Sequence, residues 1–170
     1  RIADAAIATS DMAVEACRAA MAMAQAGPED IDLVITGTVT PDYRLPSTSC
    51  VIQEKMGLVN AAAFDVVSAC TGFINGLSVA KALIETGRAR NILFVHADKL
   101  GTGVTAQGGI DLFSTAGISA EWEVPFGQHY STVAALATTR YQFETGCSDE
   151  ELAAVCVSNR KWAELNPHAF

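Results

Sequence analysis

The fold is decided by residues 63–87, which read AFDVVSACTGFINGLSVAKALIETG. Apart from Asp65, residues 63–67 are apolar and partly β-branched, which is typical of a buried strand. After the small residues 68–72, apolar side chains recur at helical spacing until Gly87 ends the pattern. These helical positions are Phe73, Ile74, Leu77, Ala80 and Leu83. The stretch therefore predicts a strand, a tight turn and a helix.

The flanking sequence repeats this alternation of strands and helices. Residues 31–39 (IDLVITGTV) and 91–97 (NILFVHA) predict two more buried strands. A helix is expected between Ser10 and Gly27, and a short one between Ser47 and Gly57. Alternating strands and helices indicate an α/β fold, in which helices cover both faces of a mostly parallel sheet. We therefore expect a three-layer sandwich.

Composition excludes several classes of protein. The chain has 170 residues, of which 50% are hydrophobic, and this is typical of a globular protein. Its net charge of −8 would repel a phosphate backbone, so a nucleic-acid partner is not expected. No apolar run reaches the roughly 18–20 residues of a membrane span. The five cysteines show neither a C-x-x-C pair nor metal-ligand spacing, which predicts reduced thiols in a cytoplasmic protein without a metal site.

Cys70 stands in the predicted turn between a strand and a helix. A thiolate there would be stabilised by the helix dipole, and nearby backbone N–H groups could bind the oxyanion of an attacked thioester. A sulfur nucleophile also suits thioester exchange. The alternative is a small buried hydrophobic residue, which is the commoner role of a lone cysteine. Core packing is the expectation for Cys17, Cys50 and Cys156, and a turn position for Cys147.

Two motifs resemble a known family. Residues 65–73 (DVVSACTGF) resemble the nucleophile motif of β-ketoacyl-acyl-carrier-protein synthase III, the initiating condensing enzyme of bacterial fatty acid biosynthesis. Residues 40–50 (TPDYRLPSTSC) resemble the loop that follows this family's second major strand. The resemblance implies a thiolase-like fold, a homodimer, and Cys70 as the catalytic cysteine that becomes acylated. It identifies no substrate-binding residue.

Residues 101–170 depart from the synthase III pattern. The segments 120–127 (AEWEVPFG) and 151–170 (ELAAVCVSNRKWAELNPHAF) resemble thiolases of the sterol-carrier-protein type, which are acetyl-CoA acetyltransferases. We therefore expect residues 1–100 to form the N-terminal half of a thiolase-fold domain that carries the nucleophile. Residues 101–127 would be a flap or insertion, and residues 128–170 a helical excursion of the same domain. The C-terminal half of the fold is expected to be absent.

The resemblance implies an acyltransferase that takes an acyl group from acyl-CoA onto Cys70 and condenses it to a 3-oxoacyl thioester. Acyl-CoA and acyl carrier protein are the expected partners, with no metal or redox cofactor. One alternative is a thiolase, which works without decarboxylation. Another is a non-catalytic fragment or partner-binding subunit. Selective alkylation of Cys70 would distinguish an enzyme from a binding module.

Both families carry their acid–base residues in the second half of the fold, so complete turnover by this chain alone is not expected. The histidines of the chain are His96, His129 and His168, and none lies in a catalytic motif of either family. His96 is expected to be a packed strand residue and His129 a solvated or capping group. Asp65, in the strand before Cys70, is expected to be hydrogen-bonded within the fold.

Overall fold

The computed structural model of the chain describes residues 3–100, 118–119 and 121–169. It forms two compact units, Arg1–Thr105 and Ala106–Phe170. Most of the predicted flap at 101–127 lies outside the described residues. The assignment of residues 128–170 to the same domain as 1–100 stays a prediction. No helix in the described ranges has both the length and the apolar character needed to cross a bilayer.

The first unit is built on three parallel strands. These are β1 (Leu33–Gly37), β2 (Ala62–Val66) and β3 (Ile92–His96), arranged in the order β2-β1-β3. Strand β1 lies in the centre, where Leu33 pairs with Ala62 on one side and with Ile92 on the other. All five residues of β1 are buried, as the apolar run at 31–39 predicts.

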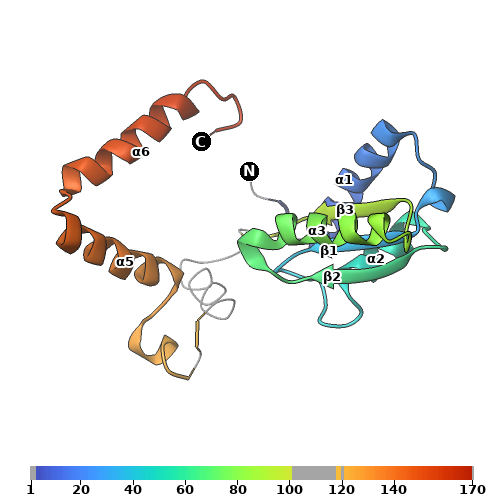
Figure 1. Ribbon diagram of the computed structural model, residues 1–170, viewed down its shortest axis with the longest axis horizontal. Coiled ribbons are helices and arrows are strands. Elements are labelled where there is room, and N and C mark those ends of the chain that lie inside the picture. Colours follow the sequence, from blue (N-terminus) through green and yellow to red (C-terminus); the bar gives the residue numbers. More distant parts are fainter. Residues whose placement is uncertain (1–2, 101–117, 120, 170) are drawn as a thin grey trace. The chain divides into compact units, whose positions relative to one another are not determined.

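Helices cover both faces of this sheet (Figure 1). Helices α1 (Thr9–Ala24) and α2 (Thr48–Met56) lie on one face, and α3 (Gly72–Glu85) lies on the other. The side chains of β1 alternate between them, so that Val34 faces the first layer and Leu33 and Ile35 face α3. The predicted three-layer α/β architecture is confirmed for this unit.

The core under α1 and α2 is the larger of two buried clusters. It contains Ala13, Val14, Cys17 and Met21 from α1, Ile52 from α2, and Val34, Leu93 and Val95 from the sheet. The cluster under α3 consists of Leu33, Ile35, Ala80 and Ala89. Burial of apolar surface on both faces therefore fixes the sheet, and with it the positions of the loops at the carboxyl ends of the strands.

The second unit contains α5 (Tyr130–Thr145) and α6 (Asp149–Ala163), and a short 3-10 helix at Val124–Phe126 precedes them. Helix α5 is followed by its C-cap residue, Gly146, in the left-handed conformation. Helix α6 begins with the side chain of Ser148 accepting a hydrogen bond from the Glu151 N–H. Neither helix has a buried residue. Core packing of Cys156 is therefore a wrong prediction, since its thiol is exposed.

Candidate active site

The candidate site lies at the carboxyl edge of the parallel sheet, where the three strands end side by side. Residues 38–40 follow β1, residues 67–71 follow β2 and residues 97–99 follow β3. In an open α/β sheet, ligands bind at this edge because the loops there are free to carry functional groups. Cys70 belongs to the loop that follows β2.

Cys70 lies in a tight 3-10 turn, Ala69–Thr71, between β2 and α3, and its thiol is exposed. The turn leads into α3 without a break, because the Gly72 N–H donates to the Ala69 carbonyl. The predicted location of Cys70 between a strand and a helix is confirmed. The α-helix begins two residues later than Cys70 because the turn is wound as a 3-10 helix rather than as the first turn of α3. The catalytic role of Cys70 stays a prediction.

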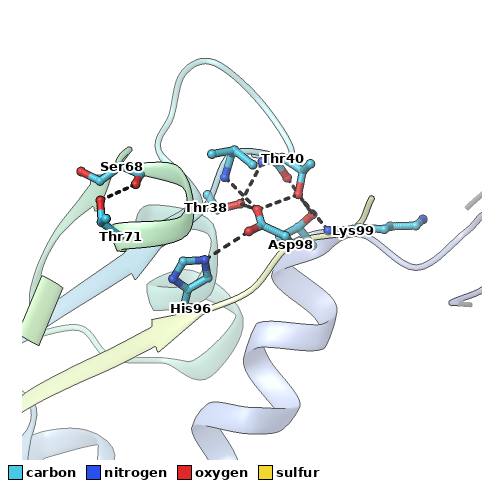
Figure 2. A network of polar contacts seen from close by, with 9 residues as sticks. Thr38, Thr40, Ser68, Thr71, His96, Asp98 and Lys99 are labelled. Carbon is cyan, nitrogen blue, oxygen red and sulfur yellow. Dashed lines mark hydrogen bonds and ion pairs between the residues drawn. The ribbon is translucent and has the colours of Figure 1, made fainter. Parts of the chain in front are cut away.

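The turn is held by its own hydrogen bonds. The Thr71 N–H donates to the Ser68 carbonyl at 3.0 Å, and the Thr71 hydroxyl donates to the same oxygen at 2.8 Å (Figure 2). Ala69 has φ +42°, in the left-handed region that L-residues other than glycine rarely adopt. Such strain is found at functional sites, where the surrounding structure maintains it. The sequence contains no signal for this conformation, because alanine has no preference for it.

Asp65 joins the strand before Cys70 to helix α2. Its carboxylate accepts hydrogen bonds from the Thr48 N–H at 2.7 Å and from the Ser49 N–H at 2.8 Å. These N–H groups belong to the first turn of α2 and have no carbonyl partner within the helix. The expectation that Asp65 is hydrogen-bonded within the fold is confirmed. The side chain is a structural cap for α2, and a negative charge is favourable at that end of a helix.

Asp98 organises the loops after β1 and β3. Its Oδ1 accepts hydrogen bonds from the Val39 N–H at 2.8 Å and from the hydroxyls of Thr38 at 3.0 Å and Thr40 at 3.2 Å (Figure 2). Burial by itself raises the pKa of Asp98, but these hydrogen bonds and one from His96 together hold the pKa below its usual value. The carboxylate is therefore ionised at neutral pH. Sequence reasoning missed this residue, although a polar side chain just after a parallel strand is a usable signal.

His96 is the last residue of β3, and its Nε2 lies 3.1 Å from Oδ2 of Asp98. The prediction of a packed strand histidine is confirmed, because the side chain is only 23% exposed. His129 stands at the N-cap position of α5, but its side chain makes no capping hydrogen bond, and its backbone N–H donates instead to the Thr132 hydroxyl. His168 is near the end of the second unit. Within the described ranges, no group of three or more His, Cys, Asp or Glu side chains could hold a metal ion.

The other cysteines differ in how deeply they are buried. Cys17 is 1% exposed in the core, as predicted, and burial raises the pKa of its thiol to about 11. Cys50 is half-buried in α2, where its sulfur accepts a hydrogen bond from the Ser47 hydroxyl. Cys147 lies in the turn between α5 and α6, as predicted. The two exposed thiols belong to different units: Cys70 lies at the carboxyl edge of the parallel sheet in the first unit, and Cys156 lies on α6 of the second.

Comparison with known proteins finds relatives that are similar to part of the chain. Residues 64–113 match the family model of 3-oxoacyl-[acyl-carrier-protein (ACP)] synthase III. The β-ketoacyl-[acyl-carrier-protein] synthase III of Caldanaerobacter subterraneus subsp. tengcongensis is 50% identical over 100 residues, which are 59% of this chain and 30% of the relative. The enzyme of the same name from Clostridium perfringens strain 13 is 50% identical over 92 residues, which are 54% of this chain and 28% of the relative.

Solved structures agree with these relatives. The 3-oxoacyl-[acyl-carrier-protein] synthase III of Aquifex aeolicus superposes with a TM-score of 0.57 at 40% identity, over 59% of this chain and 32% of that structure. OleA of Xanthomonas campestris superposes with a TM-score of 0.51 at 37% identity, over 52% of this chain and 26% of that structure. The chain thus spans about 30% of the length of the relatives that it matches. The resemblance indicated by residues 40–50 and 65–73 is confirmed, and this part of the chain has the thiolase-like α/β fold of β-ketoacyl-[acyl-carrier-protein] synthase III.

Proposed function

We propose that Cys70 is the acyl-accepting nucleophile of a condensing acyltransferase of the synthase III kind, acting in fatty acid biosynthesis. The observation that carries this proposal is the position of the exposed Cys70 thiol, in a strained turn that leads directly into helix α3. The positive end of a helix dipole favours a thiolate and an oxyanion alike. The similarity of residues 64–113 to synthase III supports the same role.

In the proposed first step, the Cys70 thiolate attacks the thioester carbonyl of an acyl-CoA. A carbon–sulfur bond to Cys70 forms, the bond to the CoA sulfur breaks, and CoA leaves as a thiolate that takes up a proton. The backbone N–H of Cys70 is the proposed donor for the tetrahedral oxyanion, because the N–H groups of Thr71 and Gly72 already donate to the carbonyls of Ser68 and Ala69. The step exchanges one thioester for another, so little driving force is needed.

In the second step, a malonyl thioester on acyl carrier protein loses CO₂, and its carbanion attacks the acyl group. The product is a 3-oxoacyl thioester, and the Cys70 thiolate is released. The reaction as proposed needs no metal or redox cofactor, because the decarboxylation supplies the electron pair for the new carbon–carbon bond. Acyl-CoA and acyl carrier protein are the proposed partners of a cytoplasmic homodimer.

The test is intact-mass spectrometry of the chain after incubation with acetyl-CoA. Wild type and Cys156→Ala, which removes the exposed thiol of α6, should each gain one acetyl group. Cys70→Ala should gain none. A folded wild type that stays unmodified, while Cys70 reacts readily with iodoacetamide, would contradict acyl transfer and favour a non-catalytic fragment. In a protein that also contains the second half of the fold, the addition of malonyl-carrier protein or of acetyl-CoA alone would distinguish a synthase from a thiolase by the product formed.

A further inference from the structure

The imidazole of His96 lies between two glycines that belong to different elements. A Cβ on Gly37, the last residue of β1, would be 3.0 Å from Nδ1 of His96. A Cβ on Gly72, the first residue of α3, would be 2.9 Å from Cε1 of the same ring. The distance at Gly72 is shorter than real Cβ contacts, and the distance at Gly37 is tighter than most of them, so the ring occupies space that side chains at these positions would need. His96 is thus a spacer between the central strand and helix α3.

The ring is oriented by Asp98. An ionised carboxylate can only accept hydrogen bonds, so Nε2 of His96 carries the proton in its 3.1 Å contact with Oδ2. The other carboxylate oxygen is held by the Val39 N–H and the Thr38 hydroxyl. The imidazole is therefore tied through Asp98 to the loop after β1, in the way that a carboxylate fixes the tautomer of a ligating histidine.

The second ring nitrogen of His96, Nδ1, is buried and has no hydrogen-bond partner. Burying an unpaired acceptor is unfavourable, and native proteins retain such groups where another requirement outweighs the cost. Because Nδ1 is enclosed beside Gly37 and Gly72, it cannot reach a proton on a substrate. The geometry therefore excludes a general base and favours a role in which the shape and the anchoring of the ring matter.

We propose that His96 and Asp98 are positioning residues for the Cys70 turn. Gly72, against which the ring packs, donates its N–H to the carbonyl of Ala69 and lies two residues after Cys70. A shift of the ring would therefore move the first turn of α3 together with the thiol and the nearby N–H groups. This inference rests on the proposed role of Cys70 as nucleophile.

The test measures single-turnover acylation of the full chain by acetyl-CoA. It compares His96 variants that keep or lose a hydrogen-bond donor to Asp98. His96→Gln keeps a donor at the place of Nε2, whereas His96→Asn and His96→Ala leave Asp98 without it. We expect His96→Gln to acylate within about threefold of wild type, and the other two to lose about tenfold or more in maximal rate, because small misplacements of reacting groups are costly. Asp98→Asn should behave like His96→Asn.

Two further readouts distinguish positioning from general support of the fold. The half-saturating acetyl-CoA concentration and the rate of Cys70 alkylation by iodoacetamide should stay within about twofold of wild type in every folded variant, because a small reagent does not require an aligned oxyanion site. His129→Ala, in the second unit, is the control. It should match wild type in the maximal acylation rate, the half-saturating acetyl-CoA concentration and the rate of Cys70 alkylation. If His96→Ala does not fold, the comparison of His96→Gln with His96→Asn decides.

The outcomes are distinguishable. An acylated wild type with a His96→Asn variant of equal maximal rate overturns the positioning role and leaves the proposed function intact. A parallel fall of acylation and alkylation in His96→Asn, with His96→Gln not rescued, also overturns it, since the ring would then only support the fold. A wild type that is folded and never acylated overturns the proposed function, and the positioning role with it.

Discussion

A Cβ on Gly76 would lie 2.4 Å from two ring carbons of Phe94. Gly76 is in the middle of α3, and Phe94 is in the middle of β3. The Phe94 ring also lies 5.5 Å, between centroids, from the ring of Phe73 in the first turn of α3. Helix α3 therefore approaches the sheet closely enough that any side chain at position 76 would push it away. The same approach sets the height of the Cys70 turn above the sheet edge.

Substitution of Gly76 by alanine is expected to destabilise the first unit. Overpacking costs about 1–3 kcal/mol, and the better helix propensity of alanine returns about 1 kcal/mol. We therefore expect a net loss of up to about 2 kcal/mol in the free energy of unfolding, measured by urea titration. Ser78→Ala, at an exposed position of the same helix, should stay within about 0.5 kcal/mol of wild type.

The contact between Gly76 and Phe94 can also be tested with a double-mutant cycle. Phe94→Leu makes room beside Gly76, so the double variant should be more stable than the sum of the single effects predicts. Strict additivity of Gly76→Ala and Phe94→Leu would show that the two groups are not in contact.

Asp65→Ala should weaken helix α2. It leaves the N–H groups of Thr48 and Ser49 without their acceptor, and a loss of about 1–3 kcal/mol in the free energy of unfolding is expected. Asp65→Asn keeps one acceptor oxygen and should lose about half as much. Glu54→Ala, at an exposed position of α2, is the matched control. Equal midpoints of urea unfolding for Asp65→Ala and Glu54→Ala would refute the capping role.

Much of this fold could be predicted from the sequence, because the spacing of apolar residues and the residues that end helices and strands act locally. The expected strand at 63–67 is β2 at Ala62–Val66, and the helix expected to end at Gly87 is α3, which ends at Glu85. Boundaries shift by one or two residues because hydrogen bonding, not composition, decides where an element ends. The parallel arrangement was also predictable, since each strand is followed by a helix.

The parts that sequence reasoning missed depend on contacts between distant segments. The strand order β2-β1-β3 brings His96 beside Gly37, and only then can the ring lie against Gly72. The prediction of core packing failed for Cys156. Apolar helical spacing predicts which face of a helix can pack, but it does not predict whether another element covers that face. Its helix α6 has no buried residue.

Stability should depend on pH through Asp98. Its pKa is lowered in the folded state, so its contribution is present above the unfolded value of about 3.9 and is lost as the pH falls through the folded value. Wild type should therefore be more stable than Asp98→Asn at pH 7, and the difference should shrink below about pH 4. Chemical unfolding of both proteins from about pH 7 down to about pH 3 measures the difference.

Thr38→Val serves as the control for this pH dependence. It removes one of the hydrogen bonds that lower the pKa of Asp98 in the folded state, so the pH-dependent loss of stability should be smaller than in wild type and complete at a higher pH. A difference between wild type and Asp98→Asn that stays constant down to pH 3 would mean that the carboxylate gains nothing from its donors in the folded state.

The cysteines should report folding through their reactivity. Cys17 is buried, and burial raises the pKa of its thiol to about 11, so iodoacetamide at pH 8 should spare it in the native chain. The exposed Cys70 and Cys156 should be labelled first. Cys17 should become reactive only across the urea transition of the first unit, as peptide mass spectrometry would show. Labelling of Cys17 without urea, at the rate of Cys156, would show that the core opens locally.

The last prediction concerns the strained turn itself. Ala69 with φ +42° and Gln25 with φ +54° are the described non-glycine residues with positive φ. Left-handed backbone costs an L-residue about 1–2 kcal/mol, and glycine avoids most of this cost. After allowance for the greater freedom of glycine in the unfolded chain, Ala69→Gly and Gln25→Gly should each raise the free energy of unfolding by about 0.5–1 kcal/mol.

The two variants should differ in acylation by acetyl-CoA. Gln25 ends helix α1, away from the carboxyl edge of the sheet, so Gln25→Gly should acylate Cys70 at the wild-type rate. Ala69→Gly frees the residue that sets the direction of the Cys70 side chain, and its acylation rate should fall about threefold to tenfold because fewer encounters find the thiol aligned. If Ala69→Gly is both more stable and equally fast, the strain at Ala69 has no part in the chemistry. If it is more stable and slower, the turn gives up stability to hold Cys70 in place, which is the trade-off expected of a functional site.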